Sequence, residues 1–217
     1  MENLEKLFSI TLYILKGSGV TLGLYAITAV FSMPLGLMCA LGKISKNKIL
    51  SKAVSLYTWV FRGTPLLLQL FFTYYGLPVL GIRWSGPFAP AALTFILNYG
   101  AYLTEIFRAG IQSIDKGQYE AAKVLGMNYS QTMRKIIIPQ TVKRILPPLG
   151  NEAITLVKDT ALVAVIALAE ILRNAKEIVT REFIITPFFI AAAIYLVLTS
   201  VIVLTFNRME EKYSYYE

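Results

Sequence analysis

The sequence predicts an all-α integral membrane protein with five transmembrane helices. Three observations favour this fold class: an apolar composition, long runs without charge, and basic residues gathered between those runs. Of the 217 residues, 56% are hydrophobic and 16% are charged, with a mean hydropathy of +0.58. Soluble domains carry about 25% charged residues, so this composition is typical of a membrane protein.

The helix boundaries follow from the apolar runs, since a spanning helix needs roughly 20 apolar residues. Three runs contain no charged residue, and two further runs are interrupted by intramembrane charges. We predict transmembrane helices within one domain (1–217) over residues 17–42, 53–76, 86–107, 145–168 and 184–207. Residues 1–16 mix apolar and polar side chains and predict a short interfacial helix. They lack the basic start and small-residue site of a cleaved signal.

The basic residues fix the orientation of the chain. With five spans, residues 43–52, residues 108–144 and the C-terminal tail lie on one side, and together they carry thirteen Lys and Arg. The other side carries six. The richer side is the cytoplasm, so we expect the N-terminus outside in a multi-pass protein of a prokaryotic inner membrane. Charge in membrane-flanking loops also explains the net charge of +8 without nucleic acid.

Residues 115–140, between the third and fourth spans, are too polar to cross lipid but have a helical pattern. Gly126 can end a first helix in a left-handed conformation. Asn128 or Ser130 can cap a second helix, and Pro139 is expected to end it. We predict a helix–turn–helix on the cytoplasmic side.

This segment reads EAAKVLGMNYSQTMRKIIIP and resembles the EAA loop of ABC-importer permeases, with Ile138 where leucine is usual. The motif positions are Glu120, Ala121, Ala122, Gly126 and Pro139. The sequences FRGTP at 61–65, YYGLP at 74–78 and YLTEIFR at 102–108 are similar to permeases for polar amino acids, the histidine, glutamine and arginine group. The chain is most similar to an arginine-importer permease.

The resemblance implies a type I ABC importer permease fold and a set of partners. The EAA loop would couple to a dimer of ABC ATPase subunits, which would bind ATP and Mg²⁺. This chain lacks the G-x-x-x-x-G-K-[ST] phosphate loop, so we expect no cofactor and no enzymatic activity of its own. The other implied partners are a second permease copy (a homodimer) or a homologous permease, and an extracytoplasmic binding protein. With no histidine and the single cysteine Cys39, we expect no metal site.

Ionisable residues at membrane depth are costly and mark candidate sites. At a rise of ~1.5 Å per residue, Asp159 and Asn98 lie about 13 and 15 Å from the outer ends of their spans, near the middle of the bilayer. Glu152 and Thr155 share the helix face of Asp159. Asn98, Tyr102 and Glu105 form a second stripe.

The second predicted span breaks at Gly63-Thr64-Pro65. Thr64 is expected to cap a half-helix there, whose N-terminus could meet an anion. Our hypothesis places a substrate α-carboxylate at Thr64 with help from Arg62. A cationic side chain then meets Asp159 and Glu152, with Asn98 as hydrogen-bond partner. Arginine fits best, because its guanidinium pairs with carboxylates bidentately. The predicted substrate-binding residues are Asp159, Glu152, Asn98, Thr64, Arg62, Thr155 and Tyr102.

Structural roles compete with each of these assignments. Arg62 could pair with Glu105 or Glu152, and Asn98 could only bridge helices. Glu105 lies beside Arg108 and favours a structural role, and Lys158 could snorkel or neutralise an acid.

Two other functions also stay open. In a glutamine, glutamate or opine permease, Arg62 or Lys158 would bind the acidic or amide substrate. In a channel or proton-coupled carrier, Glu152 and Asp159 would relay ions without an ATPase.

Overall fold

The computed structural model describes residues 2–213, and within that range every regular element is helical. Residue 1 and residues 214–217 of the predicted domain lie outside it. In chain order the elements are α1 (Glu2–Lys16), α2 (Ser18–Ile44), α3 (Lys48–Gly63), α4 (Leu66–Phe71), η1 (Phe72–Gly76), α5 (Leu77–Val79), α6 (Phe88–Gln112), α7 (Lys116–Val124), α8 (Tyr129–Thr132), η2 (Met133–Ile137), α9 (Ile138–Asp159), η3 (Thr160–Ile166), α10 (Ile171–Glu182) and α11 (Thr186–Tyr213).

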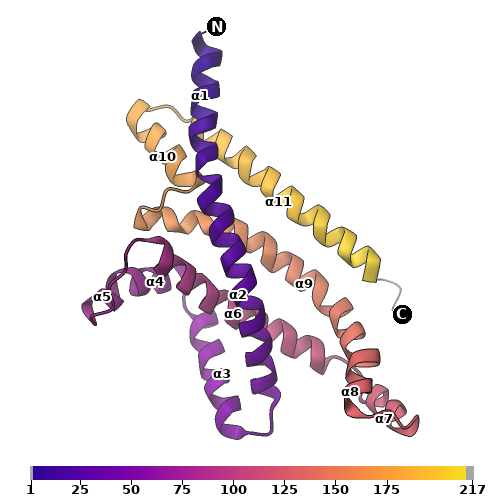
Figure 1. Ribbon diagram of the computed structural model, residues 1–217. Coiled ribbons are helices and arrows are strands. Elements are labelled where there is room, and N and C mark those ends of the chain that lie inside the picture. The colour runs from indigo at the N-terminus through magenta and orange to yellow at the C-terminus, as the bar shows by residue number, and fades with distance from the viewer. Residues whose placement is uncertain (1, 214–217) are drawn as a thin grey trace.

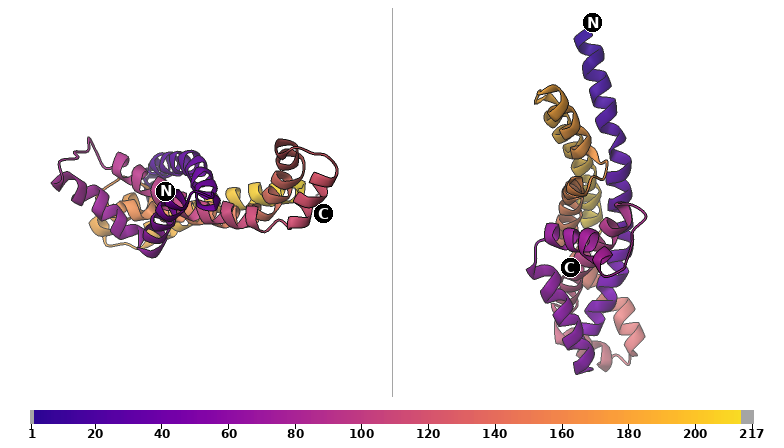
Figure 2. Two further views of the ribbon diagram at one scale, coloured as in Figure 1. Left: turned by 90° about the horizontal axis from the view of Figure 1, so that it is seen from below. Right: turned by 90° about the vertical axis from the view of Figure 1, so that its left-hand side faces the viewer.

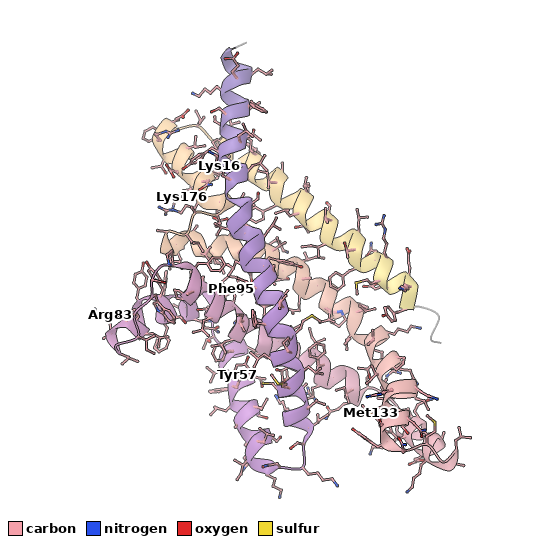
Figure 3. The ribbon with its side chains drawn as sticks, in the orientation of Figure 1. Lys16, Tyr57, Arg83, Phe95, Met133 and Lys176 are labelled. Atoms are coloured by element: carbon pink, nitrogen blue, oxygen red, sulfur yellow. The ribbon has the colours of Figure 1, made fainter. Side chains whose placement is uncertain are left out.

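The bundle is built around α6, which packs along α2 and also contacts α3, α4 and α9 (Figure 1). Its central side chain Phe95 is fully buried among Leu24, Leu70 and Ile166 (Figure 3). Close approach of α2 and α6 needs Gly36, because an added Cβ would lie 2.7 Å from the Cβ of Leu103. Small residues at such positions are the usual way in which membrane helices pack closely.

The N-terminal segment continues into the first long helix. α1 and α2 are separated only by Gly17 and run as one rod (Figure 1). A Cβ on Gly17 would lie 2.5 Å from the backbone of Glu170, so only glycine fits this joint. The interfacial position of residues 1–16 stays a prediction, but α1 does not turn aside from α2.

The predicted helix over 53–76 is indeed broken at Gly63-Thr64-Pro65: α3 ends at Gly63 and α4 begins at Leu66. The prediction that Thr64 caps the second half is wrong. The N-cap residue is Pro65, which has no side-chain hydrogen bond to α4. The Thr64 hydroxyl instead donates to the carbonyl of Val60 at 2.8 Å, a bond that the extended backbone of Thr64 allows.

The prediction that Pro139 ends a helix is also wrong. α8, η2 and α9 follow one another without a break, and Pro139 lies in the first turn of α9. The N–H of Ile138 bonds to the carbonyl of Met133, which is a π-helical pairing. Proline lacks an N–H and its ring clashes with the carbonyl four residues earlier, so the wider π-turn lets the helix continue.

A π-helical turn also occurs before Pro78. There η1 ends at Gly76, and the N–H of Leu77 bonds to the carbonyl of Phe72. The indole N–H of Trp84 donates to the carbonyl of Thr73 at 2.9 Å. A carbonyl near the proline, where helical N–H donors are missing, is thereby satisfied.

The fourth predicted span, 145–168, also differs in detail. The α-helix begins earlier, at Ile138, ends at Asp159, and continues as the 3₁₀-helix η3 to Ile166. Pro147 and Pro148 lie inside α9 without interrupting it.

A separate helix, α10, precedes the last long helix and was not predicted. Its N-cap is Glu170, whose carboxylate accepts the N–H groups of Leu172 at 2.7 Å and Arg173 at 2.6 Å. The hydroxyl of Tyr195 in α11 donates to the same carboxylate at 2.6 Å. Glu170 is fully buried and joins α10 to α11.

Two helices in the described range are long and apolar enough to cross a membrane, Leu4–Ile44 and Thr186–Tyr213. Leu66–Val79 is a shorter apolar helix. The count of five spans and the orientation of the chain remain predictions from the charge pattern.

Candidate functional site

A cavity of about 390 Å³ lies where α3, α4, α6 and α9 meet. We call it the carboxylate cavity. All seven predicted substrate-binding residues line it: Asp159, Glu152, Asn98, Thr64, Arg62, Thr155 and Tyr102. Gly63, Pro65, Leu66 and Tyr99 complete the lining. Residues separated by almost a hundred positions in the sequence are therefore brought to one place.

Two half-buried carboxylates on α9 give the cavity its acidic side. Glu152 and Asp159 lie two helical turns apart, with Thr155 between them. The hydroxyl of Tyr99 donates to Oδ2 of Asp159 at 2.8 Å, so α6 orients this carboxylate. The second oxygen of Asp159 has no hydrogen bond to another described residue. A cationic group in the cavity would meet at least one unused carboxylate oxygen.

The α3–α4 break is held by two amides. The Nδ2 of Asn98 donates to the carbonyl of Phe61 at 3.1 Å and to Oε1 of Gln69 at 3.0 Å. Gln69 in turn donates to Phe61 and to both oxygens of Thr64. Because both donors of Asn98 are engaged within the protein, the structural interpretation of Asn98 as a bridge between helices accounts for its amide nitrogen.

Arg62 lies at the end of α3 and carries the one positive charge of the carboxylate cavity. Its guanidinium carbon is 5.3 Å from the centre of the Tyr102 ring, within cation–π range. Among residues 2–213, no carboxylate comes within salt-bridge distance of Arg62. The possible pairs of Arg62 with Glu105 or Glu152 are therefore not formed.

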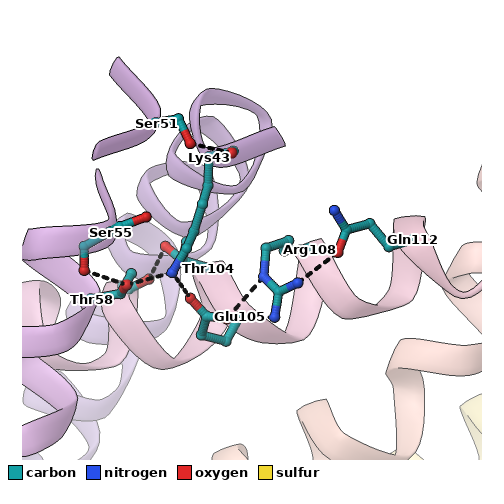
Figure 4. Close-up of polar contacts among 9 residues, drawn as sticks. Lys43, Ser51, Ser55, Thr58, Thr104, Glu105, Arg108 and Gln112 are labelled. Atoms are coloured by element: carbon teal, nitrogen blue, oxygen red, sulfur yellow. Dashed lines mark hydrogen bonds and ion pairs between the residues drawn. The ribbon is translucent and has the colours of Figure 1, made fainter. Parts of the chain in front are cut away.

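Glu105 belongs to a different cluster, shown in Figure 4. It forms ion pairs with Lys43 of α2 and with Arg108 of its own helix, the latter at 2.8 Å. Lys43 also donates to Thr58 of α3 at 2.8 Å. The cluster joins α2, α3 and α6, which confirms the structural interpretation of Glu105.

A second cavity, of about 380 Å³, lies against this cluster. We call it the lysine cavity, and its lining residues are Lys43, Ser55, Thr58, Trp59, Arg62, Gly63, Tyr102 and Glu105.

Lys158 faces elsewhere. It lines an apolar groove with Tyr195 and Phe188 of α11 and does not line the carboxylate cavity. A role for Lys158 in reading a substrate in that cavity therefore has no support from the geometry.

The EAA-like segment stands apart from the bundle at one end of the molecule (Figure 2), where Figure 3 places Met133. Asp115 caps α7 through the N–H of Gly117 at 2.6 Å. Asn128 caps α8 in a reciprocal pair with Gln131, with both bonds at 2.9 Å. Gly126 has φ +71°, as the predicted left-handed helix end requires.

The motif residues divide by exposure. Ala122 is fully buried inside the segment, while Glu120 and Ala121 lie in α7 at its surface. The most exposed apolar side chains of the segment are Val124, at 87%, and Leu125 and Tyr129, at 76% and 77%. Three such side chains within six residues of the chain make this segment a candidate for a protein contact.

Sequence reasoning missed Tyr99, which lines the carboxylate cavity, and Gln69, which holds the α3–α4 break beside it. Tyr99 follows Asn98 directly, but its ring is almost fully buried and only its hydroxyl reaches Asp159. Gln69 is a polar residue within the apolar segment 66–72. That isolated amide at predicted membrane depth was the available signal for a buried polar contact.

Comparison with protein families gives one model that matches residues 32–215, described as "Binding-protein-dependent transport system inner membrane component". This range includes both cavities and the EAA-like segment.

Individual proteins resemble the chain over nearly its whole length. "Arginine transport system permease protein ArtQ" of Bacillus subtilis (strain 168) is 42% identical over 195 residues, covering 89% of this chain and 88% of that protein. "Putative glutamine transport system permease protein GlnP" of Rickettsia felis is 38% identical over 213 residues, covering 97% of each. A solved structure titled "Crystal structure of an amino acid ABC transporter with histidines" has a TM-score of 0.87 and 38% identity, covering 95% and 97% of the two chains.

Proposed function

Since the chain belongs to the family of binding-protein-dependent transport system inner membrane components and is a permease subunit of an amino-acid ABC importer, we propose that it carries basic L-amino acids, with arginine favoured. The observation that carries this proposal is the carboxylate cavity, whose lining includes Glu152, Asp159 and an Arg62 that forms no salt bridge with a described carboxylate.

An α-amino acid with a cationic side chain complements this arrangement. Its side chain would pair with Asp159 and Glu152, with Tyr99 holding Asp159 in place. Its α-carboxylate would pair with the free edge of Arg62. Both are charge-assisted contacts, which are about twice as strong as neutral hydrogen bonds. The Thr64 hydroxyl is already bonded to Val60 and Gln69, so Arg62 is the better candidate for the carboxylate.

We call the EAA-like segment, residues 115–140, the coupling segment. It is joined to the predicted substrate-binding residues of α9 by one continuous helix. From Tyr129 to Asp159 the helix is continuous through η2, and its two ends are the capped start of α8 and the acidic wall of the cavity. We propose that Glu120, Ala121, Ala122, Gly126 and Pro139 belong to the contact with the ATPase. Movement of that subunit on binding ATP and Mg²⁺ would then reach Glu152 and Asp159 directly.

A second copy of this chain would complete the path. Arg62, Thr64, Pro65 and Thr155 are exposed in the single chain, so the carboxylate cavity is open on one side. A two-fold axis along the membrane normal would place two such openings face to face. We propose a homodimer in the inner membrane, with five spans per chain, the N-terminus outside and an external binding protein delivering the substrate.

Glutamine is the second candidate substrate, because a relative of similar identity is named for its transport. Its α-carboxylate would use Arg62 in the same way, but its neutral side chain would leave two carboxylates unpaired, which is unfavourable. The cavity therefore favours the cationic substrate.

The deciding experiment is ATP-dependent uptake in liposomes. The tagged chain is purified with the ATPase that accompanies it and sealed in liposomes with ATP and Mg²⁺ inside. Labelled arginine, lysine, glutamine and glutamate are then offered outside with the cognate binding protein. We expect arginine uptake that lysine competes and glutamate does not.

Other outcomes separate the alternatives. Uptake of glutamine or glutamate in place of arginine would keep the permease and discard the roles of Asp159 and Glu152. ATP-independent flux without a copurifying ATPase would favour a channel or proton-coupled carrier.

A further inference from the structure

The two cavities meet at three shared residues, Arg62, Gly63 and Tyr102. In the described chain, these are the only residues that line both. The guanidinium of Arg62 lies over the ring of Tyr102, and both residues line both cavities. An added Cβ on Gly63 would meet no atom within 4 Å, so the space beside this residue is open.

The lysine cavity lies toward the end of the molecule that carries the coupling segment. Lys43 is in the last turn of α2, and the α2–α3 connection lies at the same end as α7 and α8 (Figure 1). A ligand leaving the carboxylate cavity past Gly63 would therefore move toward the coupling end.

The charges of the two cavities are opposite. The carboxylate cavity holds Glu152 and Asp159 against Arg62, a net charge of −1. The lysine cavity holds Lys43 and Arg62 against Glu105, a net charge of +1. Glu105 also pairs with Arg108, which does not line this cavity. The lysine cavity is therefore suited to the carboxylate of an amino acid and the carboxylate cavity to its cationic end.

We propose that the lysine cavity is a second station for the transported amino acid, entered carboxylate first. Arg62 can meet the carboxylate from either cavity, and Gly63 is the opening between them. The ring of Tyr102 holds Arg62 across this opening until the substrate draws it aside. This inference rests on the proposed function, because it takes the same class of substrate.

The first test compares Gly63→Leu with Gly19→Leu in the reconstituted complex with ATPase and binding protein. A leucine side chain at position 63 would fill the opening, while Gly19, where an added Cβ also meets no atom within 4 Å, lies outside both cavities. Gly19→Leu is expected to transport arginine within about twofold of wild type. Gly63→Leu is expected to lose about tenfold or more in uptake, while arginine bound per complex changes less than about twofold, because only passage is blocked.

The uptake and binding results distinguish the proposed substrate from the proposed second station. Wild-type complex without arginine binding or uptake would overturn the proposed substrate. Normal wild-type uptake together with normal Gly63→Leu uptake would overturn only the second station.

A labelling test does not depend on transport. It therefore tests the second station even if the Gly63→Leu variant fails to assemble. Cys39 is the single cysteine of the chain, so a Cys39→Ala background reports only on introduced thiols. Ser55→Cys marks the lysine cavity and Thr155→Cys marks the carboxylate cavity. A small cationic methanethiosulfonate is added from the side of the coupling segment, without substrate.

Ser55→Cys is expected to react about tenfold faster than Thr155→Cys, because the reagent reaches the lysine cavity first. Tyr102→Leu removes the ring under Arg62 and should speed the reaction of Thr155→Cys about fivefold or more. Tyr102→Phe keeps the ring and should leave that labelling rate unchanged. Equal rates at the two cysteines, or no effect of Tyr102→Leu, would overturn the proposal.

Discussion

At the scale of single residues, the site depends on which polar atoms remain free. Tyr99 engages one oxygen of Asp159, and the protein satisfies the amide nitrogen of Asn98. Arg62 is stacked on Tyr102 with no acidic partner among residues 2–213. The cavity therefore offers free charge of both signs, at Arg62 and on α9, and each can be tested by a single substitution.

Asp159→Asn is expected to raise the KM for arginine uptake by about tenfold or more, since a charge-assisted hydrogen bond contributes about 1.5–3 kcal/mol. The KM for a neutral amino acid should change much less. The measurement is initial uptake rate against substrate concentration in the reconstituted complex. Lys158→Gln is the control, because it changes the adjacent charge outside this cavity and should leave the preference for arginine intact. Unchanged arginine kinetics in Asp159→Asn would contradict the assignment.

Glu170 gives a prediction of pH dependence. Burial raises the pKa of its carboxyl, while the Tyr195 hydroxyl and two backbone N–H groups oppose that shift. Because the folded-state pKa lies above the unfolded one, the folded state holds the proton more tightly. The stability that this group contributes is therefore fully present below the ordinary pKa of 4.5 and is lost as the pH rises through the raised pKa.

Glu170→Gln should remove this part of the pH dependence, because the amide does not titrate. The measurement is the thermal midpoint of both proteins from about pH 4 to about pH 8, with the slope compared between them. Equal slopes would show that Glu170 does not titrate in this range. Glu182→Gln is a useful control of opposite sign, since Lys6 and Arg181 lower the pKa of Glu182.

At the scale of elements, helix continuity is decided by local hydrogen bonding around proline. Pro78 and Pro139 each follow a π-turn that lets the helix pass, whereas Pro65 coincides with a complete break. Near Pro65, Asn98 and Gln69 satisfy the carbonyl of Phe61, so an open break is stable there. The prolines alone did not indicate which outcome would occur.

Two glycines in α2 allow a test of how closely this helix packs against α6. Gly36→Ala is expected to destabilise the protein by about 1–3 kcal/mol, because its Cβ would overlap Leu103 of α6. Gly19→Ala, in the same helix with no atom within 4 Å of the added Cβ, should be neutral or stabilising by up to about 1 kcal/mol. Thermal unfolding of the detergent-solubilised protein compares the two variants. Equal midpoints would argue against tight α2–α6 packing.

At the scale of the whole molecule, the long helix from Tyr129 to Asp159 links the EAA-like segment to the carboxylate cavity. The coupling segment lies outside the bundle, and the acidic wall of the carboxylate cavity lies inside it. Since a packed helix moves largely as a rigid element, displacement of the coupling segment is expected to move Glu152 and Asp159 together. The ion pairs of Glu105 with Lys43 of α2 and with Arg108 of its own helix hold the neighbouring helices in place beside this long helix.

Leu125→Glu is expected to reduce copurification of the ATPase at least about tenfold, because it places a charge in the exposed apolar surface of the coupling segment. The folded permease should be recovered in normal amount. Ile49→Glu is the matched control, since Ile49 is also exposed, at 82%, and lies in α3 at the same end. Equal loss of the ATPase in both variants would contradict a specific contact at Leu125.

The sequence by itself determined the class of the protein and predicted residues that line the carboxylate cavity. Apolar runs and charge placement predicted a helical membrane protein, and the EAA-like motif identified the permease family that the family match then showed. The intramembrane charges predicted the residues of the carboxylate cavity, because charge in an apolar span is costly unless it faces a partner or a cavity. Asn128 and Gly126 predicted their helix ends because these signals are local.

Only the tertiary structure decided which polar groups were free. Glu105 pairs with Lys43, which is 62 residues away in the sequence, and this leaves Arg62 unpaired and available. Likewise Tyr99 and Gln69 gained their roles from Asp159 and Asn98 on other parts of the chain. Pair energies depend on distance and on competition among neighbours, and neither is encoded in a local pattern of residues. The two adjoining cavities arise from the same long-range packing.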